Sequence, residues 1–312
     1  MKKRKKILIS GVILGLFVGT ITLYNAHNPI ENAKAISNDE TLNLSNNSSK
    51  VFTNSDADKR ELLNMMINSI DYFKNASGSF RYYSKNADTD MDVDFIVDIE
   101  NSKSYEKNTF RNLKTKSITD PFEESVFNGE YYSVYRSDDY LALQGVSDES
   151  ARNGEYNQLS YDKIFIPDSL KKKSKNIDSI EDRIITTDGK ETYVRKTETS
   201  LMGITKTVLL PEDFAIGFMG TDFNKWNIVS NDKYLGRNCV VVESKLNEYY
   251  KEKHNAISSK FIIDSSTGIL LESHLIDDEG NDTFFTQINT LNINQILKTN
   301  VFDKHSSMIK EG

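Results

Sequence analysis

The chain has 312 residues, a formal net charge of −7 and one cysteine, Cys239. That length is enough for one domain with a substantial core or for two small ones. The acidic balance argues against nucleic acid as a partner, because nucleic-acid binding needs a basic surface, and against adhesion to anionic lipid headgroups by charge. A single cysteine excludes an intramolecular disulfide.

An apolar segment follows a basic N-terminus. The cations at positions 2–6 precede residues 7–24, which carry no charge. Membrane spans need roughly 17–25 apolar residues and signal-peptide cores roughly 7–15, so residues 1–35 are predicted to be a signal peptide or a signal anchor. Ala33-Lys34-Ala35 offers a small-x-small cleavage site, and both cleavage and retention stay open. Because basic residues remain on the cytoplasmic side, we expect an extracytoplasmic protein, anchored to the bacterial cell membrane by the N-terminal helix or secreted after cleavage.

Composition divides the remainder of the chain. Residues 36–55 are rich in Asn and Ser and poor in aromatics, so they are predicted to form a flexible tether. No Pro/Gly-rich linker interrupts residues 56–303, which are predicted to form one domain, and residues 304–312 a flexible tail. Without the cations at positions 2–6, the net charge of the exported part goes from −7 to about −12.

The domain is expected to open with an amphipathic helix, from about Asp58 to Lys74. Apolar residues recur there at steps of three and four, which is the helical period. They form one stripe, which favours a face packed on the core over a partner-binding face: Leu62, Met65, Met66, Ile70 and Phe73.

After the helix the period changes to two. Val93, Phe95 and Val97 alternate with acidic residues, which predicts a strand in a sheet that is apolar on one face and solvated on the other. Asn128-Gly129 is a hairpin signal, and strand residues are expected around it, through 140–143. An irregular excursion is expected over 147–183, with helical turns near 156–170. A return to strand is expected over 192–210, interrupted at Met202-Gly203.

Pro211 marks a predicted helix start, because Pro suits a first turn and Glu212 and Asp213 suit the positive end of the helix dipole. Aromatic residues are dense from there to Trp226. They could form a helix that fills the sheet or the wall of an apolar ligand site, and both can hold together. The block 235–294 then reads as strands joined by tight turns. We count nine to eleven strands, mostly antiparallel.

No constellation in the sequence predicts catalysis. The histidines are scattered, with His305 in the expected tail, and none has metal-ligand spacing. Alternate aspartates over 88–94 lack the glycine and glutamate of a calcium loop, so they fit the wet face of a strand better. Nucleophile-elbow, phosphate-loop and dinucleotide motifs are absent from the sequence. We therefore expect a protein that is not an enzyme and has no metal and no cofactor.

The C-terminal block resembles the N-terminal domain of the RseB/MucB family, whose unclosed barrel is shared with the LolA and LolB lipoprotein carriers. The resemblance rests on Leu235-Gly236-Arg237 before a Val-rich strand, on Asp264 with Thr267-Gly268, on Leu270-Leu271, and on Asp277 with Gly280. Residues 79–82 after the first helix also resemble the start of that family. The likeness could cover residues 56–302.

The resemblance implies an α+β, β-rich fold: a strongly curved antiparallel sheet, or unclosed β-barrel, wrapped around a few helices. It implies a non-catalytic module that holds a lipid, acyl chain or lipoprotein in a concave apolar cavity and reports envelope state. The alternative is a protein-interaction domain that regulates a membrane anti-sigma factor or another envelope partner without a lipid. The chain ends at Gly312, so the family's second domain is expected to be missing. The residues expected to line the cavity are Phe95, Val97, Phe214, Phe218, Trp226, Val240 and Val242.

Overall fold

A computed structural model describes residues 50–111, 120–143, 158–171, 178–188 and 190–309. The predicted signal or anchor segment, residues 1–35, lies outside them, and so does nearly all of the tether. Among the described residues, no helix combines the length and the apolarity that crossing a bilayer requires.

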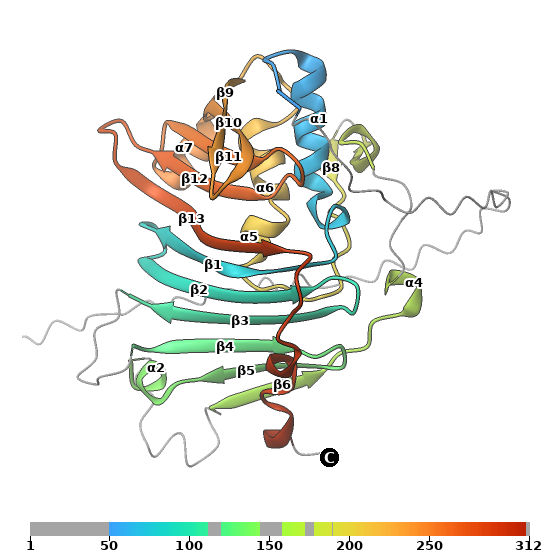
Figure 1. The fold of residues 1–312 in the computed structure, drawn as a ribbon. Helices are drawn as coiled ribbons and strands as arrows, with labels where there is room; N and C mark the ends of the chain where they lie inside the picture. The colour runs from blue at the N-terminus through green and yellow to red at the C-terminus, as the bar shows by residue number, and fades with distance from the viewer. Residues whose placement is uncertain (1–49, 112–119, 144–157, 172–177, 189, 310–312) are drawn as a thin grey trace, which may run out of the picture. The chain divides into compact units, whose positions relative to one another are not determined.

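Eleven antiparallel strands form one sheet, in the order β6-β5-β4-β3-β2-β1-β13-β12-β11-β10-β9 (Figure 1). The sheet is two meanders, joined where the first strand pairs with the last. Strands β6 and β9 are its two ends and do not pair with each other, so the barrel is unclosed. The strands are β1 (Asn75–Ser84), β2 (Thr89–Asp98), β3 (Lys103–Phe110), β4 (Phe122–Phe127), β5 (Tyr131–Arg136), β6 (Leu159–Lys163), β9 (Trp226–Tyr234), β10 (Arg237–Lys245), β11 (Ser258–Asp264), β12 (Leu270–Ile276) and β13 (Asp282–Ile293).

The helices are short apart from the first. A separate hairpin, β7 (Ile184–Thr187) and β8 (Lys190–Tyr193), lies outside the large sheet. The helical elements are α1 (Asp56–Ile67), η1 (Ser69–Asp71), α2 (Asp138–Leu143), α4 (Asp168–Lys171), η2 (Glu181–Arg183), α5 (Lys206–Leu209), α6 (Glu212–Phe214), the π-helical turn η3 (Ala215–Met219), α7 (Glu248–His254), η4 (Thr299–Asp303) and η5 (Ser306–Met308).

One face of the sheet, here called the inner face, carries the apolar alternation. Strand register places Val242 opposite Phe261 in one strand pair and Val93 opposite Phe80 in another. Helix α1 contacts η3, α5 contacts β12, and η3 contacts β10, so these helical elements pack on the inner face (Figure 1). Their side chains and those of the strands form two buried apolar clusters. The inner face of β9–β13 is therefore filled by the chain's own helices.

The turn between β11 and β12 explains the motif that carried the sequence resemblance. Asp264 Oδ1 accepts hydrogen bonds from the backbone N–H groups of Ser266 (3.0 Å) and Thr267 (2.9 Å), and Arg237 donates to the other carboxylate oxygen. Gly268 has φ +75°, and a Cβ there would lie 2.4 Å from the carbonyl carbon of Met65 in α1. The motif therefore packs the turn tightly against the first helix.

Several predicted elements differ in the structure. Residues 140–143, predicted as strand, belong to α2, because the Ser137 hydroxyl caps the Tyr140 N–H (3.2 Å) and two aspartates occupy the first turn of the helix. Residues 192–210 are strand only to Tyr193, and the chain then bends into α5. Where helical turns were expected near 156–170, the structure has the edge strand β6 and then the short helix α4, while residues 147–157 and 172–177 lie outside the described residues. The first helix and the helix start after Pro211 are confirmed.

The opposite, outer face of β3–β5 is covered by the end of the chain. Phe302 is 2% exposed and packs with Tyr105 and Val126. Glu124 accepts hydrogen bonds from Tyr105 Oη (2.8 Å) and His305 Nε2 (3.1 Å) and pairs with Lys304. Part of the expected tail, residues 304–308, thus continues against the sheet.

Candidate ligand-binding interior

The residues predicted to line a cavity all lie on the inner face or in the elements that cover it. Val240 and Val242 project from β10, and Phe95 and Val97 from β2. Each is 9% exposed or less. They fall into two clusters: the β2 pair belongs to one, and the remaining members belong to the other, namely Phe214, Phe218, Trp226, Val240 and Val242. Their role in ligand binding stays a prediction.

The short helical elements α5, α6 and η3, which pack on the inner face, are here called the cover. An aromatic seam joins them to the sheet. The ring of Phe214 in α6 meets Phe261 of β11 edge-on at a centroid distance of 5.5 Å, and Phe218 in η3 lies 4.8 Å from Tyr250 of α7. Such ring pairs add about 0.5–1.5 kcal/mol beyond area burial. His254 also contacts Phe218, and burial lowers the pKa of this imidazole. The π-helical turn, a rare local geometry that is frequent at functional sites, carries this seam.

A buried lysine ties the first helix to the start of β9. Lys59 is 3% exposed, and its ammonium donates to the carbonyl oxygens of Phe223 (2.6 Å) and Trp226 (2.7 Å). Trp226 Nε1 donates in turn to the carbonyl of Gly220 (3.1 Å). The loop that ends the cover is therefore fixed to α1 by hydrogen bonds from a charged donor, which are stronger than neutral ones.

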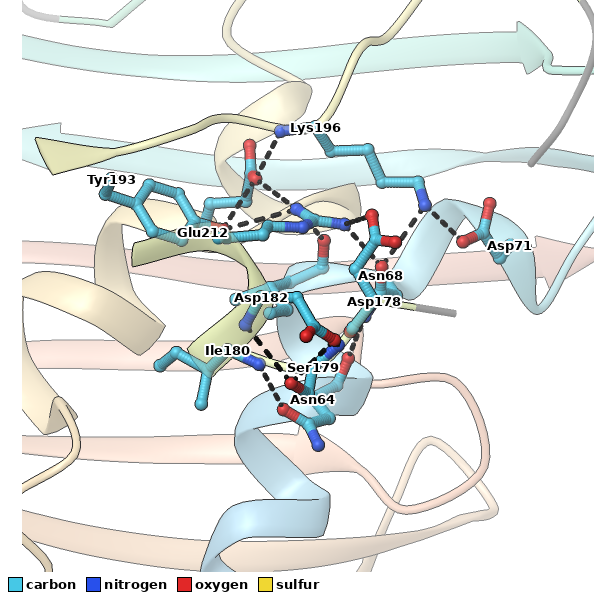
Figure 2. Close-up of polar contacts among 12 residues, drawn as sticks. Asn64, Asn68, Asp71, Asp178, Ser179, Ile180, Asp182, Tyr193, Lys196 and Glu212 are labelled. Carbon is cyan, nitrogen blue, oxygen red and sulfur yellow. Dashed lines mark hydrogen bonds and ion pairs between the residues drawn. The ribbon is translucent and has the colours of Figure 1, made fainter. Parts of the chain in front are cut away.

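A network of buried polar groups, here called the polar clasp, holds the segment 178–196 against the cover (Figure 2). Arg183 Nη1 donates to Glu212 Oε1 at 2.9 Å, and both side chains are 5% exposed or less. The same oxygen accepts from Tyr193 Oη (3.0 Å) and from the Lys196 N–H (2.8 Å). Burial, and then Glu212, raise the pKa of Tyr193.

The polar clasp also reaches the end of α1. Arg183 donates to the Ile67 carbonyl (3.1 Å) and to the Asn68 side chain, and Lys196 pairs with Asp71. Few buried apolar residues belong to this segment, with Ile180 the main example. Its attachment is therefore largely electrostatic, and such attachment depends strongly on each partner being in place.

Toward β3–β5 the inner face turns polar. The row Asn108–Glu123–Arg136 crosses three neighbouring strands in register, and Arg136 Nε lies 3.0 Å from Glu123 Oε2. Burial raises the pKa of Glu123 and raises the pKa of Tyr132 on β5 to about 12. The sequence patterns gave these residues no role in a site, because their strands lack a clean alternation of apolar and polar positions.

Ser133, His305 and Glu124 form a hydrogen-bonded line on the outer face. Ser133 Oγ lies 2.8 Å from His305 Nδ1, and His305 Nε2 lies 3.1 Å from Glu124 Oε1. All are 5% exposed or less, under the end of the chain. A nucleophile must reach a substrate carbonyl, and the Ser133 hydroxyl is enclosed. We therefore interpret this line as the fastening of the C-terminal segment.

A surface hollow of about 530 Å³ lies at the end of the β4–β5 hairpin. It is lined by residues of that turn and of the segment after β6, and shares none with the predicted set: Gly129, Glu130, Lys163, Ile164, Phe165, Ile166 and Asp168. It is an open surface feature apart from the inner face.

No family model matches the sequence, and no curated protein matches it. Among solved structures, MucB of Pseudomonas aeruginosa in its complex with MucA is similar over 78% of this chain and 60% of that chain, at 14% identity and a TM-score of 0.39. The lipoprotein LppX of Mycobacterium tuberculosis is similar over 78% of this chain and 100% of that one, at 8% identity and a TM-score of 0.36. A putative outer membrane lipoprotein-sorting domain of Vibrio parahaemolyticus covers 80% and 98%, at 10% identity and a TM-score of 0.26.

The similar structures thus include MucB and a lipoprotein-sorting domain, the groups to which the sequence resemblance pointed. This chain spans about three fifths of the MucB chain that it matches.

Proposed function

We propose that this chain is a non-catalytic, extracytoplasmic binding module that holds the apolar chain of a lipid or lipoprotein on the inner face of its open sheet. The proposal rests on which elements cover this face and on how they are held there. The apolar wall of β9–β13 is closed by short helical elements rather than by further strands, and the segment beside them is held mainly by the polar clasp.

Insertion of a ligand between the cover and the sheet is the step that this arrangement supports. An acyl chain between the sheet and the rings of Phe214 and Phe218 keeps both apolar surfaces buried, since apolar burial is non-directional. Opening the polar clasp costs hydrogen bonds that water can replace once Arg183 and Glu212 are exposed. The predicted lining residues are the proposed contacts of the ligand.

Native mass spectrometry of the gently purified full chain tests this function. We expect a co-purifying lipid or acylated molecule, and displacement of a hydrophobic dye by dodecyl amphiphiles. Tyr193→Phe removes one hydroxyl from the polar clasp and is expected to speed dye entry several-fold, whereas Tyr249→Phe, at an exposed tyrosine of α7, should leave it unchanged. Absence of co-purifying lipid together with absence of dye binding by the folded chain would refute the proposal.

A second candidate, a protein-interaction domain without a lipid, is favoured by one observation. Among the described residues, strand β6 pairs with β5 and ends the sheet, and an edge strand of this kind can add a strand from a partner. Tyr161 and Phe165 beside that edge are 38% and 88% exposed. A pull-down from membranes with the chain as bait distinguishes the candidates, since Tyr161→Asp should abolish partner capture and leave dye binding intact.

A further inference from the structure

We propose that the polar part of the inner face, on β3–β5, receives the head of the bound amphiphile and favours cationic or hydroxyl-bearing heads over anionic ones. This inference rests on the proposed function and adds the chemical class of ligand. The residues that would contact the head are Asn108, Glu123, Tyr132 and Arg136.

The polar patch directly continues the apolar wall. In the register between β2 and β3, Val93 lies opposite Asn108 and Phe95 lies opposite Glu106. The next two strands extend the Asn108 row through Glu123 to Arg136. A molecule with its tail beside Phe95 would therefore bring its head to this row, on the same face of the sheet.

The charges of the patch sum to a negative value. Glu106 is 4% exposed, and within the described ranges its carboxylate accepts from neutral donors: Asn108 Nδ2 (3.0 Å) and the N–H groups of Ile204 (3.1 Å) and Thr205 (2.8 Å). The guanidinium of Arg136 is already paired with Glu123. Two carboxylates thus face one guanidinium in the described part of the chain, and an anionic head would add a further negative charge at low dielectric.

Unused hydrogen-bonding capacity in the patch also fits a head that donates. Asn108 Oδ1 is buried and has no hydrogen-bond partner among the described residues, and an amide oxygen can only accept. The hydroxyl of Thr205, which is 1% exposed and donates its N–H to Glu106, also has no partner among the described residues, but a hydroxyl both donates and accepts and so does not distinguish between heads. At Asn108 Oδ1, an ammonium or sugar hydroxyl supplies a donor, whereas a fully ionised phosphate or carboxylate supplies none.

The patch stays within reach of a ligand. The side chains of Glu123 and Arg136 are each 25% exposed, and Tyr132 is half-buried. Tyr140 of α2 stacks on Phe110 at a centroid distance of 5.1 Å and flanks the row with an aromatic wall. Burial raises the pKa of Glu123, Arg136 lowers it, and Glu106 adds a smaller rise.

The test uses the full chain and three probes with the same dodecyl tail, so that only the head differs: dodecylamine, dodecyl glucoside and dodecyl phosphate, each below its critical micelle concentration. Displacement of a hydrophobic dye gives the affinities. We expect the amine and the glucoside to bind about tenfold or more tightly than the phosphate, since one unfavourable charge contact at low dielectric is worth at least that factor.

Glu123→Gln is expected to shrink the ratio of amine to phosphate affinity about tenfold, and Asn108→Ala to weaken the glucoside selectively. Asp94→Asn, at an exposed aspartate of β2, is the matched control and should change no ratio. Circular dichroism checks that each variant folds. Equal or tighter binding of the phosphate by the unaltered chain would overturn the inference and leave the proposed function standing, as would ratios insensitive to Glu123→Gln. Failure of all the probes to bind would remove the proposed function itself.

Discussion

The two halves of the sheet use the same inner face differently. In the half formed by β9–β13, Val240, Val242 and Phe261 are fully buried beneath α1, α6 and η3. In the part formed by β3–β5, the same face carries polar groups, of which Asn108 and Glu123 stay partly exposed. The C-terminal segment reinforces this second half from the outer face.

The difference separates stability from selectivity. Buried aliphatic and aromatic side chains contribute most of the folding free energy, about 1.5–3 kcal/mol each, but they do not distinguish among apolar ligands. Polar groups at the edge of an apolar site add orientation and specificity. The β9–β13 half is thus the scaffold of the interior, and the β3–β5 half is where ligands would be distinguished.

The largest expected effect is on the scaffold half. Gly268→Ala should cost about 4 kcal/mol or more, because the new Cβ would lie 2.4 Å from a backbone atom of Met65 and the residue has φ +75°. Gly280→Ala, with φ +85° and open space around it, isolates the conformational cost of about 1 kcal/mol. Thermal unfolding measures both, and equal losses would show that close packing on α1 matters little.

Breaking the polar clasp should come next. Arg183→Leu leaves Glu212 buried without its cation and should cost about 3 kcal/mol. A double-mutant cycle with Glu212→Gln measures the coupling. Arg195→Leu, which breaks an exposed ion pair with Asp213 in the same segment, should cost less than about 1 kcal/mol. Limited proteolysis of residues 178–196 should accelerate in the first variant alone; a similar rate in both would contradict a closure that depends on the clasp.

A smaller effect is expected at the outer face of the polar half. Burial alone would raise the pKa of Glu124. Hydrogen bonds from His305, Lys304 and Tyr105 outweigh burial and lower this pKa to about 2 from its usual 4.5. A lowered pKa contributes stability that is present above the unfolded value and lost as pH falls through the folded one. Glu124→Gln should therefore cost about 2 kcal/mol at neutral pH, and the difference should vanish between about pH 4.5 and 2.

Chemical denaturation at a series of pH values measures this difference, with Glu130→Gln at an exposed ion pair as the control. If the difference in unfolding free energy between the unaltered chain and the Glu124→Gln variant stayed constant down to pH 2, ionisation of Glu124 would not stabilise the folded chain.

The smallest effect separates two histidines. The hydrogen bond to Glu272, helped by Asp282, raises the pKa of His274, whereas burial lowers that of His254. Protonated His274 should contribute less than about 1 kcal/mol, present below pH 6.5 and lost as pH rises through its folded pKa. NMR titration of both imidazoles checks the opposite directions; shifts of the same sign would contradict these environments.

Sequence patterns predicted the fold where one physical rule governed a segment. The helical stripe through Leu62 and Met66, and the alternation through Val93 and Phe95, report burial directly. Patterns failed where a side chain overrode the local preference. The strand expected over 192–210 ends at Tyr193, and further along it the N–H groups of Ile204 and Thr205 donate to Glu106 instead of to a neighbouring strand. Ser137 caps α2 where a strand was expected. The first contacts join residues far apart in the sequence, and the second depends on a helix cap, so neither is visible in the hydrophobic period.

The candidate site was predictable only in its apolar part. Aliphatic and aromatic residues of a β-rich chain are expected inside, so period and composition predict that Val242 and Phe214 are buried, as they are in the structure. The polar clasp and the row from Asn108 to Arg136 depend on tertiary register, and Arg183, Glu212 and Glu123 look like ordinary surface charges in the sequence. That a charged side chain is buried can be recognised only when the positions of its partners in the fold are known.

The pairing of β1 with β13 has a consequence for how the chain acquires its structure. The two meanders can each form from local hairpins, but the sheet is complete only when residues 282–293 reach residues 75–84. Such a non-local contact slows folding, because the entropy of closing a long loop must be overcome first. Until then β1 has an open edge, so truncations that remove β13 should yield an aggregation-prone chain rather than a smaller stable domain.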